Sequence, residues 1–293
     1  MSVEEIQRPA WAVDESRVVP RAVELVEAFR EALAAMVRDH ALTFEELTAA
    51  ASVLEQLVKD GAPLELALMP LYGDLFQRKD GNHTLTDIAG PMYLRDAPFM
   101  SNPGVLPMRS DEPGVPLIAR GRVSAGDGSP LAGAELDIFQ AAMNGNYSTL
   151  GLDDQPHWNL RARQLADAEG RYEFRAITSP PYLFSPLPAV IDAAAVLGRS
   201  SHRPAHIHYV IRHQDLVEDF ANEVYFKGDP TIEHDLISPG FAAPELQADV
   251  VYHDDPEEIA AAGLDRPFNT LEFDFVLKTK SDTGTAATTA RGE

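Results

Sequence analysis

The chain of 293 residues contains no cysteine. Disulfides, thiolate zinc sites, iron–sulfur clusters and cysteine nucleophiles are therefore excluded, and any bound metal must be held by histidine, tyrosine, aspartate or glutamate. Basic residues are also scarce, since 24 lysines and arginines stand against 46 acidic residues and give a net charge of −22. This charge argues against nucleic acids and anionic membrane surfaces as partners.

Long apolar runs are absent as well. No stretch of about 18 apolar residues occurs, so we expect no membrane span. The N-terminus, Met1-Ser2-Val3-Glu4-Glu5, is acidic and no apolar signal-peptide region follows it, so no secretory signal is expected. With 45% hydrophobic residues, the composition is that of an ordinary globular protein. We therefore expect a cytoplasmic protein.

The N-terminal third has the pattern of a helical unit. Apolar residues recur at helical spacing over residues 20–39. A second helix is predicted to start at Thr43, because Thr43 and Glu46 form a capping-box pattern. A third short helical segment is predicted over residues 64–76. We expect residues 1–83 to form an α-helical domain, whose apolar stripes pack within the domain and also suit a homodimer interface.

From about residue 90 the pattern changes to short alternating runs, separated by turns that contain glycine or proline. The predicted strands cover residues 117–124, 134–141, 170–177, 205–211, 222–226 and 270–278. Short strands at this spacing are typical of a β-sandwich. We therefore expect an α+β fold, with a mainly antiparallel β-sandwich over residues 84–280 and a disordered tail over residues 281–293.

The most informative segment is Arg203-Pro204-Ala205-His206-Ile207-His208. Side chains two residues apart on a strand share one face, so His206 and His208 should point to the same place. Imidazole is the commonest metal ligand in proteins, and two rings on a rigid strand indicate half of a metal site.

Two tyrosines occupy loops that could complete such a site. Tyr147 follows a predicted strand within Asn144-Gly145-Asn146-Tyr147-Ser148, and Tyr182 follows the stiff pair Pro180-Pro181. Taken alone, each tyrosine is more often a half-buried packing residue than a metal ligand.

Two alternatives remain open at this point. In the first, His206 and His208 bind a metal with a third ligand from Glu223, His213 or His234, as in a cupin-like or zinc hydrolase site, and the tyrosines have no role. In the second, the sandwich is a non-catalytic binding module with a helical dimerisation arm.

A longer set of segments, found in a fixed order along the chain, favours one kind of site over these alternatives. The set consists of Gly90-Pro91-Met92-Tyr93, Asn144-Gly145-Asn146-Tyr147-Ser148, Asn159-Leu160-Arg161-Ala162-Arg163, Asp167-Ala168-Glu169-Gly170, Pro181-Tyr182, Arg203-Pro204-Ala205-His206-Ile207-His208 and Gly228-Asp229-Pro230. This order resembles the intradiol ring-cleavage dioxygenases. The helical N-terminal third is similar to their catechol 1,2-dioxygenase branch, which includes hydroxyquinol and chlorocatechol enzymes. The resemblance covers roughly residues 20–278.

The resemblance implies a non-haem site with one Fe(III) per chain. Tyr147 and His206 would be equatorial ligands, Tyr182 and His208 axial ones, with a hydroxide in the fifth position. Phenolate is a hard, strongly donating ligand that favours ferric iron. Family members cleave catechols with O₂ between the two hydroxylated carbons and give cis,cis-muconate-type diacids. Tyr182 would take up a substrate proton, and Arg203 would stabilise negative charge on the ring.

This chain departs from the family pattern at several positions: the pair Tyr225-Phe226 is more like the protocatechuate branch, residues 71–79 are only loosely similar to the substrate-lining helix, and two single residues also differ. Glu223 stands where the family usually has glutamine, and Phe139 where it usually has tryptophan. We expect an apolar pocket wall of Ile88, Pro91 and Met92, in which the deformable methionine tolerates ring substituents. Glu223 would repel a ring carboxylate, whereas a third hydroxyl could donate to it. The expected substrate is therefore catechol or a substituted catechol, with hydroxyquinol, giving maleylacetate, as the alternative.

Overall fold

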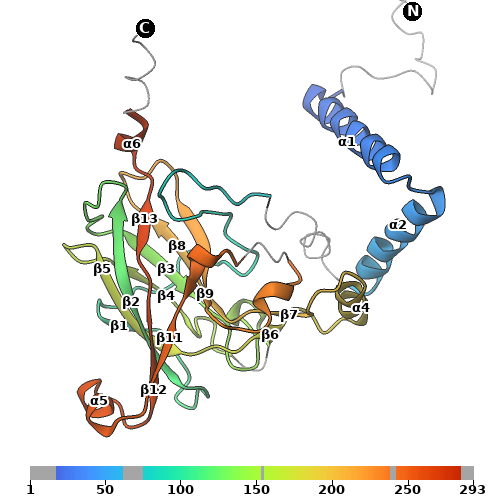
Figure 1. Cartoon of the computed structure of the whole chain (residues 1–293). Coiled ribbons are helices and arrows are strands. Elements are labelled where there is room, and N and C mark those ends of the chain that lie inside the picture. The colour runs from blue at the N-terminus through green and yellow to red at the C-terminus, as the bar shows by residue number, and fades with distance from the viewer. Residues whose placement is uncertain (1–17, 62–74, 153–154, 238–241, 285–293) are drawn as a thin grey trace, which may run out of the picture. The chain divides into compact units, whose positions relative to one another are not determined.

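Residues 18–61, 75–152, 155–237 and 242–284 are described by a computed structural model of the chain (Figure 1). The chain divides into two compact units, residues 1–59 and residues 60–293. The helical domain predicted from the sequence ends at residue 83, whereas the first unit ends at residue 59. The boundary at residue 83 stays a prediction. Within the described ranges, no helix combines the length and the apolar character that crossing a membrane requires.

Two helices make up the described part of the first unit. The helices α1 (Pro20–Asp39) and α2 (Phe44–Lys59) match the first two predicted helices. The predicted capping box is present, because the Thr43 backbone N–H donates to Glu46 Oε2 at 2.8 Å and the Glu46 N–H donates to Thr43 Oγ1 at 3.2 Å. Of the third predicted helical segment, only the last two residues are described, and they form a turn.

The apolar stripes of these helices are largely exposed within a single chain. None of the described residues of α1 is buried, and in α2 only Leu57 is. Val26 is 63% exposed and Phe29 is 70% exposed. Exposed apolar side chains that follow one another along a helix are typical of a surface that associates with another molecule.

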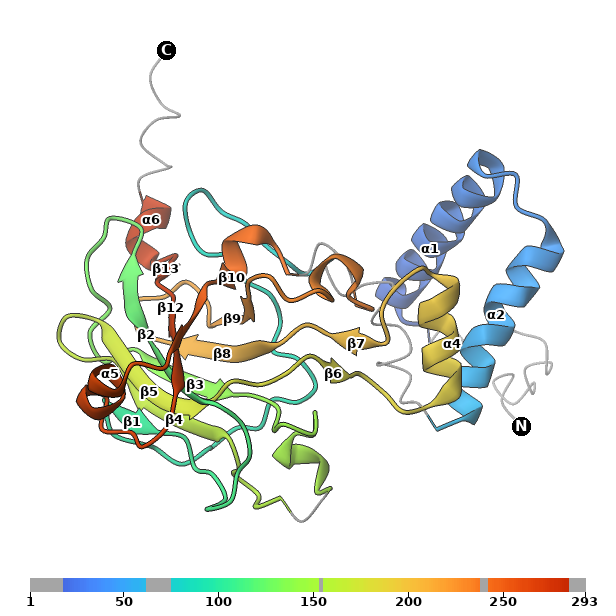
Figure 2. The same cartoon turned by 60° about the horizontal axis from the view of Figure 1, so that its bottom comes forward.

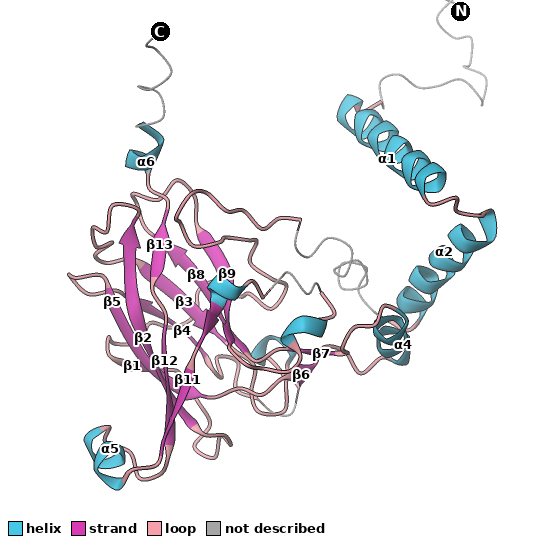
Figure 3. Ribbon diagram, in the orientation of Figure 1, coloured by secondary structure: helices cyan, strands magenta, loops and turns pink. Residues whose placement is uncertain are grey.

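The second unit is built around two large sheets and one short ribbon, and Figure 3 shows the strands in two layers. The six-stranded sheet contains, in spatial order, β1 (Gly104–Val105), β5 (Arg171–Ile177), β2 (Pro116–Ala125), β12 (Phe268–Glu272) and β11 (Val250–His253), with β13 (Phe275–Leu277) also paired to β2. The five-stranded sheet contains β10 (Gln247–Ala248), β9 (Phe220–Phe226), β8 (His206–Arg212), β3 (Glu135–Phe139) and β4 (Arg161–Leu165). The ribbon pairs β6 (Tyr182–Leu183) with β7 (His202–Arg203).

Several short helices lie in the connections of this unit. The α-helices are α4 (Pro188–Val196), α5 (Pro256–Ala261) and α6 (Lys280–Gly284), and the 3₁₀ helices are η3 (Ser148–Leu150), η4 (Ile232–His234) and η5 (Pro244–Leu246). The helix α6 contains the first residues of the predicted tail, and residues 285–293 of that tail lie outside the described ranges.

The hydrophobic core lies between the two large sheets, as the alternation of side chains along strands requires. On β8, Ile207, Tyr209 and Ile211 point into this core. Leu117 and Ala119 of β2 reach the same core from the opposite sheet. Each fully buried aliphatic side chain contributes about 1.5–3 kcal/mol to stability. The α+β sandwich predicted from the sequence is therefore confirmed.

The sheets are mixed rather than purely antiparallel, and the antiparallel pairings predominate among the described strands, in agreement with the prediction of a mainly antiparallel sandwich. The long pairings β2–β5, β3–β8 and β8–β9 are antiparallel, whereas β1–β5, β9–β10, β2–β12 and β2–β13 are parallel. Parallel neighbours need long connections, and each of these four pairs is separated by other elements along the chain. Alternation of hydrophobic residues marks a strand but does not give the direction of its neighbours.

The last predicted strand, residues 270–278, is in fact two strands, β12 and β13. The backbone carbonyl of Phe273 crosses β2 at Gly121, where a Cβ would lie 1.8 Å from the Phe273 oxygen. The Tyr172 hydroxyl donates to the same carbonyl at 2.7 Å. The glycine therefore gives room for the chain to change course between β12 and β13.

Candidate metal centre

The two histidines of the predicted metal half-site lie side by side on the outer face of the five-stranded sheet. They alternate with the core residues Ile207 and Tyr209 on β8, so the strand directs both imidazoles away from the core. His206 is 1% exposed and His208 is 6% exposed. The sheet is thus covered on this face by other parts of the chain, which form an enclosed polar site.

The partners of the two Nδ1 atoms indicate which nitrogen of each imidazole has a lone pair that can bind a metal. His206 Nδ1 donates to the carbonyl oxygen of Pro204 at 2.6 Å, since a carbonyl can only accept. His208 Nδ1 lies 3.3 Å from Glu223 Oε1, and a carboxylate favours a proton on the nearer ring nitrogen. In both rings the lone pair is therefore on Nε2, the atom that faces the tyrosines.

Tyr147 is positioned by a tight loop after β3. The Gly145 N–H donates to the Ala142 oxygen at 2.8 Å, and the Ala142 N–H donates to the Asn146 oxygen at 3.0 Å. Gly145 has a φ of 82°, in the left-handed region that glycine adopts without strain. The loop returns the chain toward β8, so that Tyr147 is buried with its hydroxyl against the two imidazoles.

Tyr182 reaches the site from the β6–β7 ribbon. In this ribbon Tyr182 is paired directly with Arg203, and Figure 2 shows the two strands side by side, with α4 joining them. Residues paired across two strands place their side chains on the same face. The ribbon therefore brings the predicted tyrosine and the predicted arginine to the site together.

The two phenol oxygens and the two Nε2 atoms converge on one point. Tyr147 Oη lies 3.2 Å from Tyr182 Oη, 3.2 Å from His206 Nε2 and 2.9 Å from His208 Nε2, and the two Nε2 atoms are 3.1 Å apart. Ligands at right angles around a metal, with bonds of about 2.1 Å, are about 3.0 Å apart. The spacing of the four atoms therefore fits a single metal ion.

Burial alone favours the uncharged form of all four groups. It lowers the pKa of His206 to about 4 and the pKa of His208 well below the ordinary histidine value. It also raises the pKa of Tyr147 and of Tyr182 above the ordinary tyrosine value. Neutral imidazoles are ready to bind a cation, and a cation at this point would stabilise the two phenolates. The donor set, two nitrogens and two hard oxygens, suits iron among the transition metals.

Glu223 lies behind His208 rather than among the four converging atoms. His206, His208 and Glu223 are the one group of three within the described ranges that proximity alone marks as a possible metal site. However, the carboxylate contacts Nδ1 of His208, on the side of the ring opposite to Nε2. Neither His213 nor His234, the other third ligands considered from the sequence, belongs to this group. The geometry thus favours the tyrosines over a third histidine as partners of the pair.

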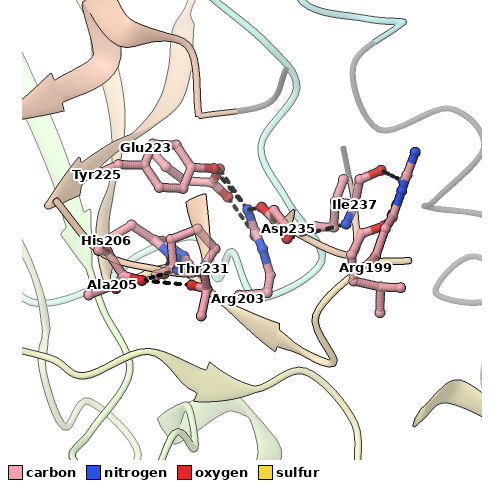
Figure 4. A network of polar contacts seen from close by, with 12 residues as sticks. Arg199, Arg203, Ala205, His206, Glu223, Tyr225, Thr231, Asp235 and Ile237 are labelled. Carbon is pink, nitrogen blue, oxygen red and sulfur yellow. Dashed lines mark hydrogen bonds and ion pairs between the residues drawn. The ribbon is translucent and has the colours of Figure 1, made fainter. Parts of the chain in front are cut away.

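Arg203 is buried among oxygen atoms beside the site (Figure 4). Its Nη1 donates to Glu223 Oε1 at 3.3 Å, and its Nη2 donates to Tyr225 Oη at 2.8 Å and to Asp235 Oδ2 at 3.2 Å. The Tyr225 hydroxyl in turn donates to Glu223 Oε2. Burial by itself would lower the pKa of Arg203, but the surrounding groups, Asp235 first among them, hold it well above its ordinary value. The guanidinium therefore remains charged.

A stack of three side chains supports the site from the other side. In the sheet register, His208 is paired with Phe139, and Phe139 with Arg161. The His208 and Phe139 rings stack at 4.3 Å with an interplanar angle of 5°, and the Arg161 guanidinium lies 4.3 Å from the centre of the Phe139 ring. The motif that contains Arg161 does not reveal this role, because the relation of Arg161 to His208 depends on the pairing of β4, β3 and β8.

A cavity of about 370 Å³ opens beside the converging atoms, and three of the four side chains, Tyr147, Tyr182 and His208, line it. All four residues expected to contact substrate lie in its wall, namely Ile88, Pro91, Met92 and Glu223. The wall also includes residues that sequence analysis missed, among them Leu150, Leu152, Leu183, Phe184 and Pro186. They follow the loops of Tyr147 and Tyr182 along the chain, so their proximity to these two tyrosines in the sequence was the available signal.

Known proteins resemble this chain in sequence. A family model described as Dioxygenase matches residues 88–279. A chlorocatechol 1,2-dioxygenase of Rhodococcus opacus is 30% identical over 230 residues, which cover 74% of this chain and 86% of the relative. A catechol 1,2-dioxygenase of Acinetobacter baylyi is 30% identical over 289 residues, 94% of this chain and 91% of the relative. A hydroxyquinol 1,2-dioxygenase of a Rhizobium species is 30% identical over 217 residues, 72% of this chain and 70% of the relative.

Solved structures resemble this chain in fold. The structure of a catechol 1,2-dioxygenase from an Acinetobacter species, inhibited by bound mercury, has a TM-score of 0.72 at 27% identity, and the match covers 89% of this chain and 87% of that chain. The family match spans most of the sandwich unit, and each relative aligns over more than two thirds of both chains. The chain therefore belongs to the intradiol ring-cleavage dioxygenases.

Proposed function

We propose that the chain binds one ferric ion through Tyr147, Tyr182, His206 and His208, and that it cleaves catechol with O₂ to a cis,cis-muconate-type diacid. The observation that supports this most directly is the convergence of two phenol oxygens and two imidazole nitrogens within 2.9–3.2 Å of their neighbours. When bound there, ferric iron would lower the pKa values of the catechol hydroxyls and draw electron density from the ring.

Tyr182 and Arg203 have distinct roles in this proposal. Tyr182 lies in the cavity wall, where its phenolate would accept one of the two catechol protons. Arg203 lies in the wall of the same cavity and remains charged. A fixed guanidinium at this position would stabilise negative charge that develops on the ring during cleavage.

The cavity favours a ring without a carboxylate. Ile88, Pro91 and Met92 provide an apolar wall, and the carboxylate of Glu223 lies in the wall beside Arg203. The Glu223 carboxylate beside Arg203 would repel an anionic ring substituent. Catechol and its alkyl or chloro derivatives fit these walls better than protocatechuate.

Hydroxyquinol remains the second candidate. Its third hydroxyl would have to donate to Glu223, but both oxygens of this carboxylate are already engaged. Oε1 lies 3.3 Å from Arg203 Nη1 and 3.3 Å from His208 Nδ1, and Oε2 accepts from the Tyr225 hydroxyl. A third ring hydroxyl would therefore displace an existing contact, which supports catechol as the preferred substrate.

The proposal is tested on the purified full-length protein. We expect iron in metal analysis, a red-brown phenolate-to-iron charge-transfer band, and uptake of one O₂ for each catechol consumed. A substrate series of catechol, a methylcatechol, hydroxyquinol and protocatechuate should give the highest kcat/KM for one of the first two. A colourless, zinc-containing protein that is active, or a clear preference for protocatechuate, would contradict the proposal.

A further inference from the structure

The two histidines of the site have unlike partners behind them. His206 Nδ1 donates to a neutral backbone carbonyl, that of Pro204, at 2.6 Å. His208 Nδ1 instead lies 3.3 Å from the carboxylate of Glu223, its direct neighbour across the β8–β9 pairing. An anion behind an imidazole makes the other ring nitrogen a stronger electron donor, whereas a neutral carbonyl does so less.

Glu223 keeps much of its charge available for this contact. Its contacts with Arg203 are 3.3 Å and 3.5 Å long, compared with about 2.7–2.9 Å for a tight guanidinium–carboxylate pair. Arg203 also divides its donors, because Nη2 bonds Tyr225 and Asp235 as well. The Arg203 guanidinium is therefore shared among several acceptors, and the Glu223 carboxylate has three partners, Arg203, Tyr225 and His208.

The site has little solvent that could screen this charge. Glu223, Arg203 and His208 are each at most 6% exposed. Electrostatic contacts between buried groups are much stronger than the same contacts in water. The His208 imidazole is therefore among the groups that feel the field of the carboxylate most strongly, together with Arg203 and Tyr225.

We propose that Glu223 is a positioning residue for the metal: it fixes the His208 ring with Nε2 toward the metal and strengthens the donation of that nitrogen. The inference rests on the ferric site of the proposed function and adds to it. It assigns to Glu223 a role behind the ligand, and it makes His208 the stronger of the two imidazole donors.

The test compares the wild type with Glu223→Gln, which keeps the size of the side chain but removes its charge. We expect the affinity for iron, measured by competition with a chelator, to fall about 10- to 100-fold. The phenolate-to-iron charge-transfer band should move to longer wavelength. A ferric ion that receives less electron density from His208 is a better electron acceptor. A tenfold greater loss of ferric than of ferrous binding would raise the reduction potential by about 59 mV.

Two control variants separate the contact from the general loss of charge. Asp235→Asn removes a carboxylate that contacts Arg203 and the Ile237 N–H. Glu112→Gln removes a buried carboxylate paired with Arg109 at 2.9 Å, outside the cavity wall. Both should leave the iron affinity within about twofold and the band in place. A band shift in Asp235→Asn as large as that in Glu223→Gln would overturn the proposal.

Glu223→Asp provides a second variant in case Glu223→Gln does not fold. It keeps the charge but shortens the side chain, so we expect the same direction of change as for Glu223→Gln. Unchanged iron affinity and band position in the folded variants would overturn the role of Glu223. Absence of iron and colour in the wild type would instead refute the ferric site itself, so the two failures are distinguishable.

Discussion

Gly145 lies directly against Tyr182: a Cβ on Gly145 would be 2.7 Å from the Cβ of Tyr182. The same glycine has a φ of 82° in the loop that carries Tyr147. It therefore determines how closely the loops of the two tyrosines approach.

We expect Gly145→Ala to separate the two tyrosines. The added methyl group must displace Tyr182, so iron content and the charge-transfer band should both fall by at least about half. Gly128→Ala is the matched control, since Gly128 has a φ of 84° and a Cβ there would meet nothing within 4 Å. Both variants carry a backbone strain of about 1 kcal/mol, and a similar loss of iron in both would show that strain alone is responsible.

The two tyrosines should differ in their effects on the bound metal. Tyr147 is in contact with both imidazoles, so Tyr147→Phe removes the central member of the donor set, and iron content should fall sharply. Tyr182→Phe should retain more iron and yet lose activity, because the proposed proton acceptor is absent. Metal analysis and O₂ uptake on both variants decide this. Normal turnover in either variant would contradict its assigned role.

Arg203 should matter for stability as well as for rate. Its removal in Arg203→Ala leaves the buried carboxylates of Glu223 and Asp235 without their guanidinium, which typically costs about 3–5 kcal/mol. The rate should fall on the order of a hundredfold or more if the guanidinium stabilises charge on the ring. Urea unfolding and single-turnover kinetics measure the two effects. The double variant with Arg203→Ala and Asp235→Asn should recover part of the lost stability, because one unpaired buried carboxylate is removed, but it should recover none of the lost rate.

Asp137 should give the protein a distinctive stability profile with pH. Burial raises the pKa of Asp137 to about 6, against about 3.9 in an unfolded chain. The folded state therefore binds more protons between these values, so this group's contribution to the free energy of unfolding falls as pH rises from about 4 to about 6. Between pH 4 and pH 6, the free energy of unfolding of Asp137→Asn should therefore rise by up to about 3 kcal/mol relative to that of the wild type.

The difference in unfolding free energy between the wild type and Asp137→Asn separates the contribution of Asp137 from those of other titrating groups. His206 has the opposite sign, because its lowered pKa removes stability as pH falls from about 6.5 toward about 4. Since His206 is present in both proteins, its contribution cancels in the difference. A difference in unfolding free energy that stays flat between pH 4 and pH 6 would refute the prediction.

We expect the protein to be a homodimer that forms through the exposed stripe of α1. Val26 and Phe29 lie on this stripe, at 63% and 70% exposure. Val26→Glu combined with Phe29→Glu should give a monomer in light scattering, whereas Ala28→Glu, on the other side of the helix, should not. A wild-type monomer would refute the expectation.

Much of the fold follows from local patterns in the sequence. The capping box at Thr43 and the alternation along β2, β3, β5, β8 and β9 predict elements that the structure contains. By contrast, β4 has the sequence Arg-Ala-Arg-Gln-Leu, in which alternation is hidden because Arg161 is buried. The buried arginine is stabilised on this strand by the Phe139 ring beneath it and by a hydrogen bond from its Nη2 to the Met92 carbonyl oxygen at 2.7 Å.

The site was predictable in its residue types but not in its arrangement. The spacing of His206 and His208 indicates a shared face, and the resemblance adds the two tyrosines. The place of Glu223, however, depends on the register of β8 against β9, which puts it opposite His208. Such a register is fixed by long-range packing. For this reason the sequence suggested that Glu223 contacts substrate, and the structure adds a contact between Glu223 and Nδ1 of His208.

The β6–β7 ribbon has a consequence for how such a pocket can diversify. Because Tyr182 and Arg203 are paired across the ribbon, their spacing is set by backbone pairing and not by the length of chain between them. The connecting segment, with α4, can therefore gain or lose residues while Tyr182 and Arg203 keep their places. New pocket walls are then accessible to evolution, or to grafting from a relative, without renewed selection on the chemistry.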